Sequence, residues 1–399
     1  MKGFFRNYGL TLLMLLGVVL GGLCAVVSPE TARALKPVGE VFLNLMFTLV
    51  VPLVFFSTAS SVCNLKQSGL AGSAIGTMTV VFVAMTFVAG LIMYAICLVY
   101  NPWAGMDLSQ MGNLPPLGTA DRSFADAVVG ALSVPDFTLL FSKSSLLPLI
   151  IFSGLFGLGA AGVGAGRVSA FLQEGNAVIM KVMSIVMWVA PIGLGCYFAN
   201  VVSETGSRLL AGYGKAFVLF FVVALVFFFV IHSLYILVFC GPAKLGAYWK
   251  NILPPSFTAF CTCSSAVAIP GNIAACEAAG VRSEIARSVV PLGTTLHKDG
   301  SMISGVLKVV FISTLMGGAV AGSGLGAVGI AFLCAVVMGA VPSGALTGEI
   351  LICTLLGCDP AWAGVIMIFS TMIDMPATLV NSSANVVGAV LTDRFTKKG

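Results

Sequence analysis

Charged side chains are scarce in this chain, and their scarcity excludes whole classes of protein. Asp, Glu, Lys and Arg together make up 9% of the 399 residues, whereas hydrophobic residues make up 58%. Soluble domains carry about 25% charged and roughly 45–50% apolar residues. The 20 basic side chains outnumber the 15 acidic ones, mostly at the ends of apolar segments, which indicates membrane topology rather than nucleic-acid binding. The composition predicts an all-α polytopic membrane protein without a nucleic-acid partner.

Signatures of catalysis and of metal binding are also missing. Outside the apolar segments the sequence has no Ser/His/Asp set and no phosphate-binding loop. The 11 cysteines lie almost wholly in apolar runs and lack metal-ligand spacing, apart from the pair Cys261 and Cys263. Cysteines in such runs behave as small buried apolar residues. We therefore expect neither an enzyme nor a cofactor.

Apolar windows of about 20 residues, the length needed to cross a bilayer, predict six spans in the first part of the chain. These are 10–27, 38–62, 75–100, 146–163, 178–202 and 217–240. The first lacks an A-x-A cleavage sequence, so we expect it to remain as a helix. Basic residues, with Arg208 and Lys215 as exceptions, lie on the side opposite the acidic loop 101–130. This asymmetry predicts a multi-pass protein of the cell (inner or plasma) membrane with both termini cytoplasmic.

The rest of the chain contains interrupted apolar segments. Segment 253–279 is broken around TCSSA, and segment 325–356 is split by VPSGALTG around Pro342, Ser343 and Gly344. Each predicts two half-length helices that meet at a tip, a re-entrant hairpin that is tolerated only where protein or a cavity surrounds it. A seventh span follows the first hairpin, and an eighth, 362–391, follows the second. Such a duplicated pattern indicates a midplane binding site in a secondary transporter.

The seventh span contains the stretch PLGTTLHKDGS, which places His297, Lys298 and Asp299 side by side between apolar runs. Ionisable groups at membrane depth cost several kcal/mol unless they face a partner, an ion or water. Because Gly293 and Gly300 flank them, and an Asp-Gly step is a turn signal, we expect the helix to unwind here. Unwound carbonyls beside a carboxylate are suited to a desolvated cation. The alternative is a charge pair that satisfies itself inside the bundle.

Four polar residues of the last span share one helical face, because Asp374, Thr378, Asn381 and Asn385 are spaced four, three and four apart. A carboxylate, a hydroxyl and two amides on one face can grip a zwitterion, with Asp374 against the ammonium. The alternative is hydrogen bonding between helices, which Asn and Thr often provide. The charge of Asp374 favours ligand binding.

Three motifs occur in the order FCTCSSAVAIP, PLGTTLHKDGS and DMPATLVNSSAN. The second is similar to P-L-G-A-T-x-N-M-D-G-T and the third to D-M-G-R-T-x-x-N-x-x-G-D, so the chain resembles the dicarboxylate/amino acid:cation symporter family over nearly its whole length. The resemblance implies eight transmembrane helices plus two re-entrant hairpins in a glutamate-transporter-like elevator fold, assembled as a homotrimer in membrane lipid. Residues 1–240 would be mainly scaffold and trimerisation helices, with the third and sixth packing on the transport core, 241–399.

The same resemblance implies a substrate site. The residues implied are Ser264, Ser265, Ser301, Asp374, Ala377, Thr378 and Asn381. Asp374 would take an amino group, and Asn381 with the tip serines a carboxylate. Ala377 stands where members with acidic substrates have an Arg, and Cys263 stands where many have a second one. Because an acidic side chain would be buried without a cation, we expect a substrate with an uncharged side chain.

The resemblance also implies a cation site, which in this chain is altered. The residues implied in coupling are Gly293, Thr295, His297, Lys298, Asp299, Asn381 and Asn385. His297 replaces an Asn, Lys298 a Met, and Asn385 an Asp. The family's ligands on the third span align with Thr79, Phe82 and Val83. Sodium coupling through this set is not expected, because only Asp299 remains as an anionic ligand and an ammonium repels a cation.

The coupling ion is left open between H+ and Na+. We predict that the Lys298 ammonium lies near Asp299 in place of an ion. Glu349 and His297 are candidate proton carriers. Equally, Glu349 is the partner of Lys308, a second intramembrane charge.

The sequence thus predicts a symporter that moves a small neutral amino acid or similar zwitterion by an elevator mechanism. The alternatives are an uncoupled facilitator, a proton-coupled symporter, or a sensor or anion channel of the same fold that has lost transport.

Overall fold

The computed structural model describes residues 2–65, 72–104, 133–142, 145–164, 166–205, 207–316, 320–340, 345–359 and 361–396. Within these ranges the chain is helical apart from short connections, and no strand occurs. Most of the predicted polar loop 101–130 and the predicted second tip, Pro342 to Gly344, lie outside the described residues.

The first half of the chain forms long helices that follow the predicted apolar windows. They are α1 (Lys2–Val27), the short α2 (Pro29–Ala34), α3 (Lys36–Leu65), α4 (Gly72–Val99), the 3-10 turn η2 (Phe137–Phe141), α6 (Leu146–Gly162), α7 (Gly166–Met187), α8 (Ala190–Thr205), α9 (Ser207–Val226), the π-helical turn η4 (Phe227–Ile231) and α10 (His232–Cys240). The predicted span 217–240 corresponds to α9, η4 and α10 in succession.

The predicted fifth span, 178–202, is covered by α7 and α8 and is not one straight helix. The chain instead breaks at Trp188 and Val189, and α7 and α8 meet at a bend of 60°. The physical cause is local: Pro191 in the APIG sequence cannot donate a backbone hydrogen bond to a continuing helix. Trp188 at the bend is exposed.

The second half is made of shorter helices around one long one. They are α11 (Pro242–Thr262), α12 (Ile269–Ala278), α13 (Ser283–Leu296), α14 (Asp299–Leu315), α15 (Val320–Ala340), α16 (Ala345–Leu356) and α17 (Trp362–Phe395). Helices α11 and α12 pack on each other, as do α15 and α16. The first arm of the predicted first hairpin begins earlier than expected, because Pro254 and Pro255 lie inside α11.

Four helices of the described part are long and apolar enough to cross a membrane, and the bent pair α7–α8 would make a fifth. The eight-span topology and the elevator fold stay predictions.

Glycine allows α1 and α8 to approach closely. A Cβ atom at Gly17 or Gly21 would collide with the backbone of Pro191 or of Gly195, respectively. Small residues at such contacts let two helix backbones pack directly, which is the usual device for helix association in lipid. The α1–α8 crossing therefore fixes the N-terminal helices to one another.

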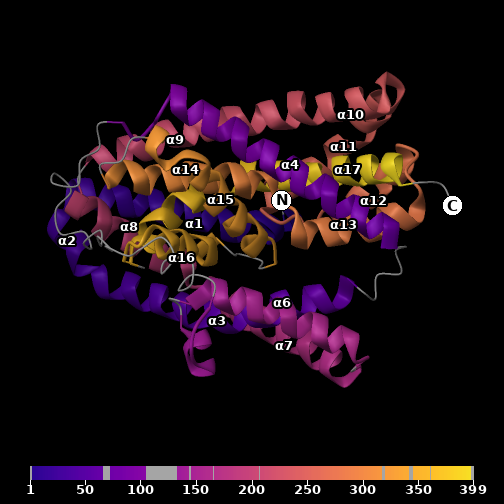
Figure 1. The fold of residues 1–399 in the computed structure, drawn as a ribbon. Coiled ribbons are helices and arrows are strands. Elements are labelled where there is room, and N and C mark those ends of the chain that lie inside the picture. Colours follow the sequence, from indigo (N-terminus) through magenta and orange to yellow (C-terminus); the bar gives the residue numbers. More distant parts are fainter. Residues whose placement is uncertain are drawn as a thin grey trace.

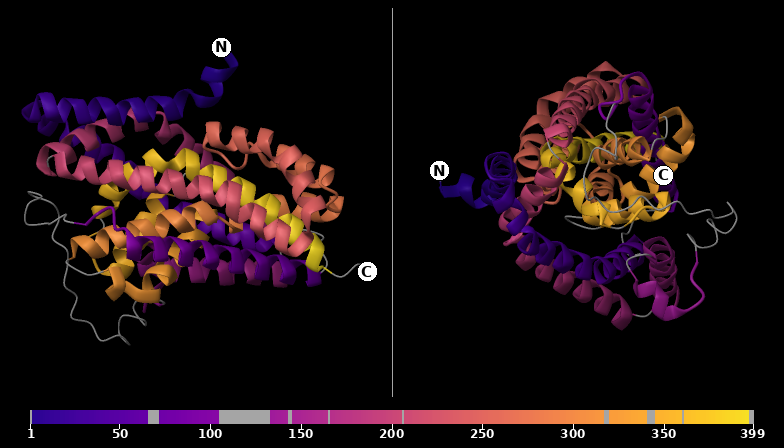
Figure 2. Two further views of the ribbon diagram at one scale, coloured as in Figure 1. Left: turned by 90° about the horizontal axis from the view of Figure 1, so that it is seen from above. Right: turned by 90° about the vertical axis from the view of Figure 1, so that its left-hand side faces the viewer.

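Helices α3, α6 and α7 form a layer along one side of the molecule, and helices α14 to α17 lie next to this layer (Figures 1 and 2). Helix α4 packs against α14, α15 and α17, and α9 packs against α17. Both α14 and α17 are buried along most of their length. The polar residues on these two helices therefore lie in the protein interior.

Basic residues tie several helix ends together at one end of the molecule. Arg282 Nε donates to Asp393 Oδ1 over 2.6 Å, and Lys244 Nζ donates to the Gly280 carbonyl over 2.8 Å. Arg394 contacts the Phe239 carbonyl at 3.3 Å. The ends of α10 and α17, the start of α11 and the α12–α13 turn thus share one face, as the charge pattern predicted for these basic residues.

Candidate functional site

The seventh predicted span is broken where the sequence indicates. Helix α13 ends at Leu296, and His297 (φ −132°, ψ 118°) and Lys298 (φ −145°, ψ 83°) are extended before α14 begins at Asp299. The unwinding is confirmed, but it is shorter than expected, because both flanking glycines lie within helices. An acidic side chain in the first turn of α14 complements the positive end of that helix.

Glycine at position 300 is required by packing rather than by unwinding. A Cβ atom there would overlap the backbone carbonyl of Ala377 on α17. Gly293 is required for a similar reason, since its Cβ would come 2.7 Å from Asn385 Oδ1. The two glycines bring the broken helix directly against the polar face of α17.

His297, and not Lys298, contacts the Asp299 carboxylate. The distance from His297 Nε2 to Asp299 Oδ1 is 2.9 Å, and His297 Nδ1 lies 3.1 Å from Asn385 Oδ1. His297 is 1% exposed, and both Asp299 and Asn385 are 0% exposed. The imidazole ring thus joins the break between α13 and α14 to α17.

The predicted pairing of Lys298 with Asp299 is wrong. No ion pair within 4.0 Å involves Lys298 among the described residues, and the charge that acts on its ammonium is that of Asp374. The reason is geometric: successive side chains of an extended segment point to opposite sides. His297 therefore turns toward Asp299, and Lys298 turns away from it.

Of the three positions on α4 that align with the family's ligands, Phe82 alone lies against His297. Phe82 is buried and stacks on His297, with ring centroids 4.3 Å apart and planes at 3°. Val83 is 39% exposed, and the exposed Thr79 donates its hydroxyl to Ile75 of its own helix. The hydroxyl that reaches Asp299 Oδ1, at 3.2 Å, belongs to Thr86. The sequence signal for Thr86 was its position one helical turn beyond Phe82.

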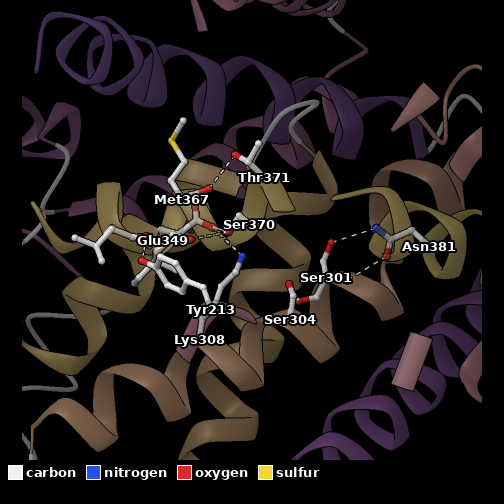
Figure 3. A network of polar contacts seen from close by, with 11 residues as sticks. Tyr213, Ser301, Ser304, Lys308, Glu349, Met367, Ser370, Thr371 and Asn381 are labelled. Carbon is white, nitrogen blue, oxygen red and sulfur yellow. Dashed lines mark hydrogen bonds and ion pairs between the residues drawn. The ribbon is translucent and has the colours of Figure 1, made fainter. Parts of the chain in front are cut away.

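The predicted substrate residues Ser301 and Asn381 bond directly to each other (Figure 3). The Ser301 N–H donates to Asn381 Oδ1 over 3.1 Å, and Asn381 Nδ2 donates to Ser301 Oγ over 3.3 Å. One turn earlier on α17, Thr378 donates its hydroxyl to Asp374 Oδ1 over 3.4 Å. Asp374, Thr378 and Asn381 therefore line one face of α17 beside the start of α14.

The turn between α11 and α12 reaches the same face. Cys263 has the left-handed conformation (φ 50°) that ends α11, and its thiol contacts the Phe260 carbonyl at 4.0 Å. Ser264 is half-buried and Ser265 is buried. Helix α12 is held on α17 where Asn272 Nδ2 donates to Ser382 Oγ over 2.8 Å. This contact fixes the predicted tip near α17.

One residue of the predicted coupling set does not face this site. Thr295 is half-buried and donates its hydroxyl to the Leu292 carbonyl of its own helix, at 2.9 Å. No contact among the described residues links the Thr295 hydroxyl to Asp299 or Asn385.

Lys308 and Glu349 form a second buried charge cluster (Figure 3). Lys308 Nζ lies 2.8 Å from Glu349 Oε1, and their side chains are 2% and 0% exposed. The Ser370 hydroxyl donates to the same carboxylate oxygen. The expectation that Glu349 is the partner of Lys308 is confirmed, whereas the proton-carrier role stays a prediction.

Serines on one face of α14 lead from this pair toward Asn381. Ser304, one turn before Lys308, donates its hydroxyl to the Ser301 carbonyl over 2.9 Å. Ser301 in turn bonds Asn381. The two buried clusters therefore lie on one helix, about 10 Å apart along its axis at 1.5 Å per residue.

A cavity beside α9, α11 and α17 has apolar walls that do not suit a charged ligand. Its volume is about 490 Å³, and its walls are mainly phenylalanine and leucine side chains of α9, α11 and α17, including Phe221, Phe257 and Leu379. Burying a zwitterion against such walls without polar partners is strongly unfavourable.

Broken helices, buried polar groups at the breaks and long apolar spans define a multi-pass membrane protein of the transporter class. The family model of the sodium:dicarboxylate symporter family matches residues 10–395. The chain belongs to this family.

Curated relatives are transport proteins with modest identity. One is a C4-dicarboxylate transport protein of Rhizobium leguminosarum, 26% identical over 76% of this chain and 70% of the relative. Another is a proton/sodium-glutamate symport protein of Geobacillus stearothermophilus, 26% identical over 78% of this chain and 76% of the relative. A third is a C4-dicarboxylate transport protein of Anaeromyxobacter sp. (strain K), 28% identical over 78% and 72%. These similarities show that the chain belongs to a symporter family. They do not identify its substrate or its coupling ion.

Proposed function

We propose that this protein is a secondary active transporter for a small zwitterion with an uncharged side chain, such as a neutral amino acid. The observation that carries the proposal is the polar face of α17, where Asp374 and Asn381 lie beside the start of α14 and Ala377 lies between them. This face offers one carboxylate, neutral donors and acceptors, and no guanidinium.

The charges of the site match those of a zwitterion. Asp374 is half-buried, accepts a hydrogen bond from Thr378 and has the Lys298 ammonium as a nearby charge, and its carboxylate is the group on this face that can pair with a substrate ammonium. The Asn381 amide and the Ser301 backbone and hydroxyl supply both donors and acceptors for a carboxylate. The remaining face holds the Ala377 methyl group, which suits a small apolar or hydroxylated side chain.

An acidic substrate is the second candidate, and Lys298 favours it. Its side chain is half-buried, it makes no ion pair within 4.0 Å among the described residues, and the Asp374 carboxylate acts on its charge. An ammonium in this position can neutralise a second carboxylate in place of the absent guanidinium. The relatives named for C4-dicarboxylates and glutamate support this alternative.

Competition binding separates the two candidates. We would measure displacement of a bound neutral amino acid by alanine, serine, glutamate, aspartate and succinate, for the wild type and for Lys298→Met. The proposal predicts displacement by small neutral amino acids alone and little change in Lys298→Met. Strong displacement by acidic solutes that disappears in Lys298→Met would establish the second candidate instead.

We further propose that transport uses an elevator movement of residues 241–399 within a homotrimer. The packing of α4 and α9 against α14 and α17 supports this division, because these two helices contact the core although they precede residue 241. Proton coupling through Glu349 is one form of the proposal, and uncoupled facilitation is another. Uptake under separately imposed gradients distinguishes them.

A further inference from the structure

The His297 ring occupies the space between the two side chains that were expected to ligate a coupling cation. Its nitrogens lie 2.9 Å from Asp299 Oδ1 and 3.1 Å from Asn385 Oδ1. These oxygens come from α14 and α17, the two helices that form the polar site. The ligand atoms therefore face the imidazole and not an open position between the helices.

One flat face of the ring is covered as well. Phe82 stacks on one face at 4.3 Å, and the edge of the same phenyl ring packs on Gly293 and Gly388. A Cβ atom at Gly293 would come within 2.8 Å of Phe82 Cζ. Such close contacts leave no room for an ion together with a full set of ligands, and a phenyl ring offers no oxygen to replace one.

The remaining oxygen atoms are too few for a hard cation. Sodium, like other hard cations, needs several oxygen ligands to replace its hydration shell, whereas imidazole nitrogen suits transition metals. Asp299 Oδ1 already accepts from Thr86 and faces His297. Of the buried side-chain oxygens of Asp299, Asn385 and Thr86, Asp299 Oδ2 alone lacks a hydrogen-bond partner among the described residues, and the nitrogens His297 Nε2 and Asn385 Nδ2 lack one as well. One carboxylate oxygen does not replace a hydration shell.

We propose that His297 permanently fills the cation position beside Asp299, so that this protein does not bind sodium there, and that shortening this side chain opens a sodium site. His297→Asn removes the ring, releases the oxygens of Asp299 and Asn385, and adds an amide oxygen. The importance of this site for uptake rests on the proposed transport function, but sodium binding itself can be measured without any substrate.

The test is sodium binding to the purified full-length protein, measured by calorimetry and by the unfolding temperature in sodium against choline at equal ionic strength. We expect saturable binding by His297→Asn with at least tenfold higher affinity than by the wild type. The matched control is His297→Phe, which keeps a ring in the space without adding oxygen, and which should stay insensitive to sodium. His297→Asn combined with Asp299→Asn should lose the new site.

Wild-type protein that binds sodium as tightly as His297→Asn overturns the proposal. The proposal is also overturned if His297→Asn elutes from gel filtration as a folded protein and shows neither sodium binding in calorimetry nor a higher unfolding temperature in sodium. If His297→Asn does not fold, His297→Ser is the second variant, and the same two results decide. Sodium binding as expected together with no uptake of any solute would refute the proposed function and leave this inference standing.

Discussion

Breaking the buried pair between Lys308 and Glu349 should cost more free energy of unfolding than any surface charge in this chain. The two charged atoms are 2.8 Å apart, and the side chains are 2% and 0% exposed. Removing one partner of a buried pair leaves the other charge unpaired and costs about 3–5 kcal/mol. At 1.4 kcal/mol per factor of ten, Lys308→Met should raise the equilibrium constant of unfolding by roughly two to four orders of magnitude.

Glu349→Gln should cost less than Lys308→Met. The glutamine carbonyl still accepts from Ser370, which donates to the glutamate in the wild type, so one hydrogen bond survives. The double variant Lys308→Met with Glu349→Leu should recover most of the loss, because replacing both charges by apolar groups is often neutral or stabilising. Lys308→Met and Glu349→Leu, each also measured as a single variant, should therefore be strongly non-additive, as expected for residues in contact.

Tryptophan fluorescence during unfolding in mixed micelles is a suitable assay. Trp103 is fully buried and its indole N–H donates to the Leu307 carbonyl, at 3.3 Å, next to the charged pair. The matched control is the exposed pair Lys36 and Glu40, 3.8 Å apart, with side chains 50% and 53% exposed. Lys36→Met should cost under about 1 kcal/mol. Single variants of the buried pair that stay within 1 kcal/mol of the wild type, or that add in the double variant, would refute the reasoning.

Three other substitutions probe the site. Gly300→Ala should lower the free energy of unfolding by about 1–3 kcal/mol, as overpacking does, because its methyl group would overlap the Ala377 carbonyl. The control is Gly326→Ala on α15, whose added methyl group has no atom within 4 Å. Equal unfolding curves for the two variants would contradict the packing at Gly300. Asp374→Asn should weaken binding of zwitterions at least a hundredfold in calorimetry without changing the oligomeric state on gel filtration. If the affinity stays within a few-fold of the wild type, Asp374 has a structural role and does not bind the substrate. Ala377→Arg should shift competition toward glutamate and aspartate, and unchanged selectivity would mean that the side-chain pocket lies elsewhere.

Sequence reasoning succeeded where a local rule decides the structure. The break at His297 and Lys298 follows from ionisable residues in an apolar span, and the shared face of Asp374 and Asn381 follows from helical spacing. Both features depend only on neighbouring residues in the chain. The apolar windows gave most helices for the same reason.

Sequence reasoning failed where the outcome depends on contacts between distant segments. Whether His297 or Lys298 reaches Asp299 depends on the direction of each side chain in a two-residue extended segment. Whether Thr86 or Val83 faces the site depends on the rotation of α4 against α14, and apolar composition does not fix that rotation. The sequence suggests Glu349 as the partner of Lys308 but cannot decide between this pairing and a proton-carrier role. The pairing is a contact between α14 and α16, and such contacts between distant segments do not follow from local sequence.

Uptake into proteoliposomes is the most direct test of the central claim, that this protein carries a small zwitterion through the face formed by Asp374 and Asn381. The wild type and Asp374→Asn would be reconstituted in parallel and given a labelled neutral amino acid under no gradient, a proton gradient or a sodium gradient. The account predicts saturable uptake by the wild type that sodium does not drive and that Asp374→Asn abolishes. Uptake driven by sodium, or binding of the solute without any uptake above protein-free vesicles, would contradict it.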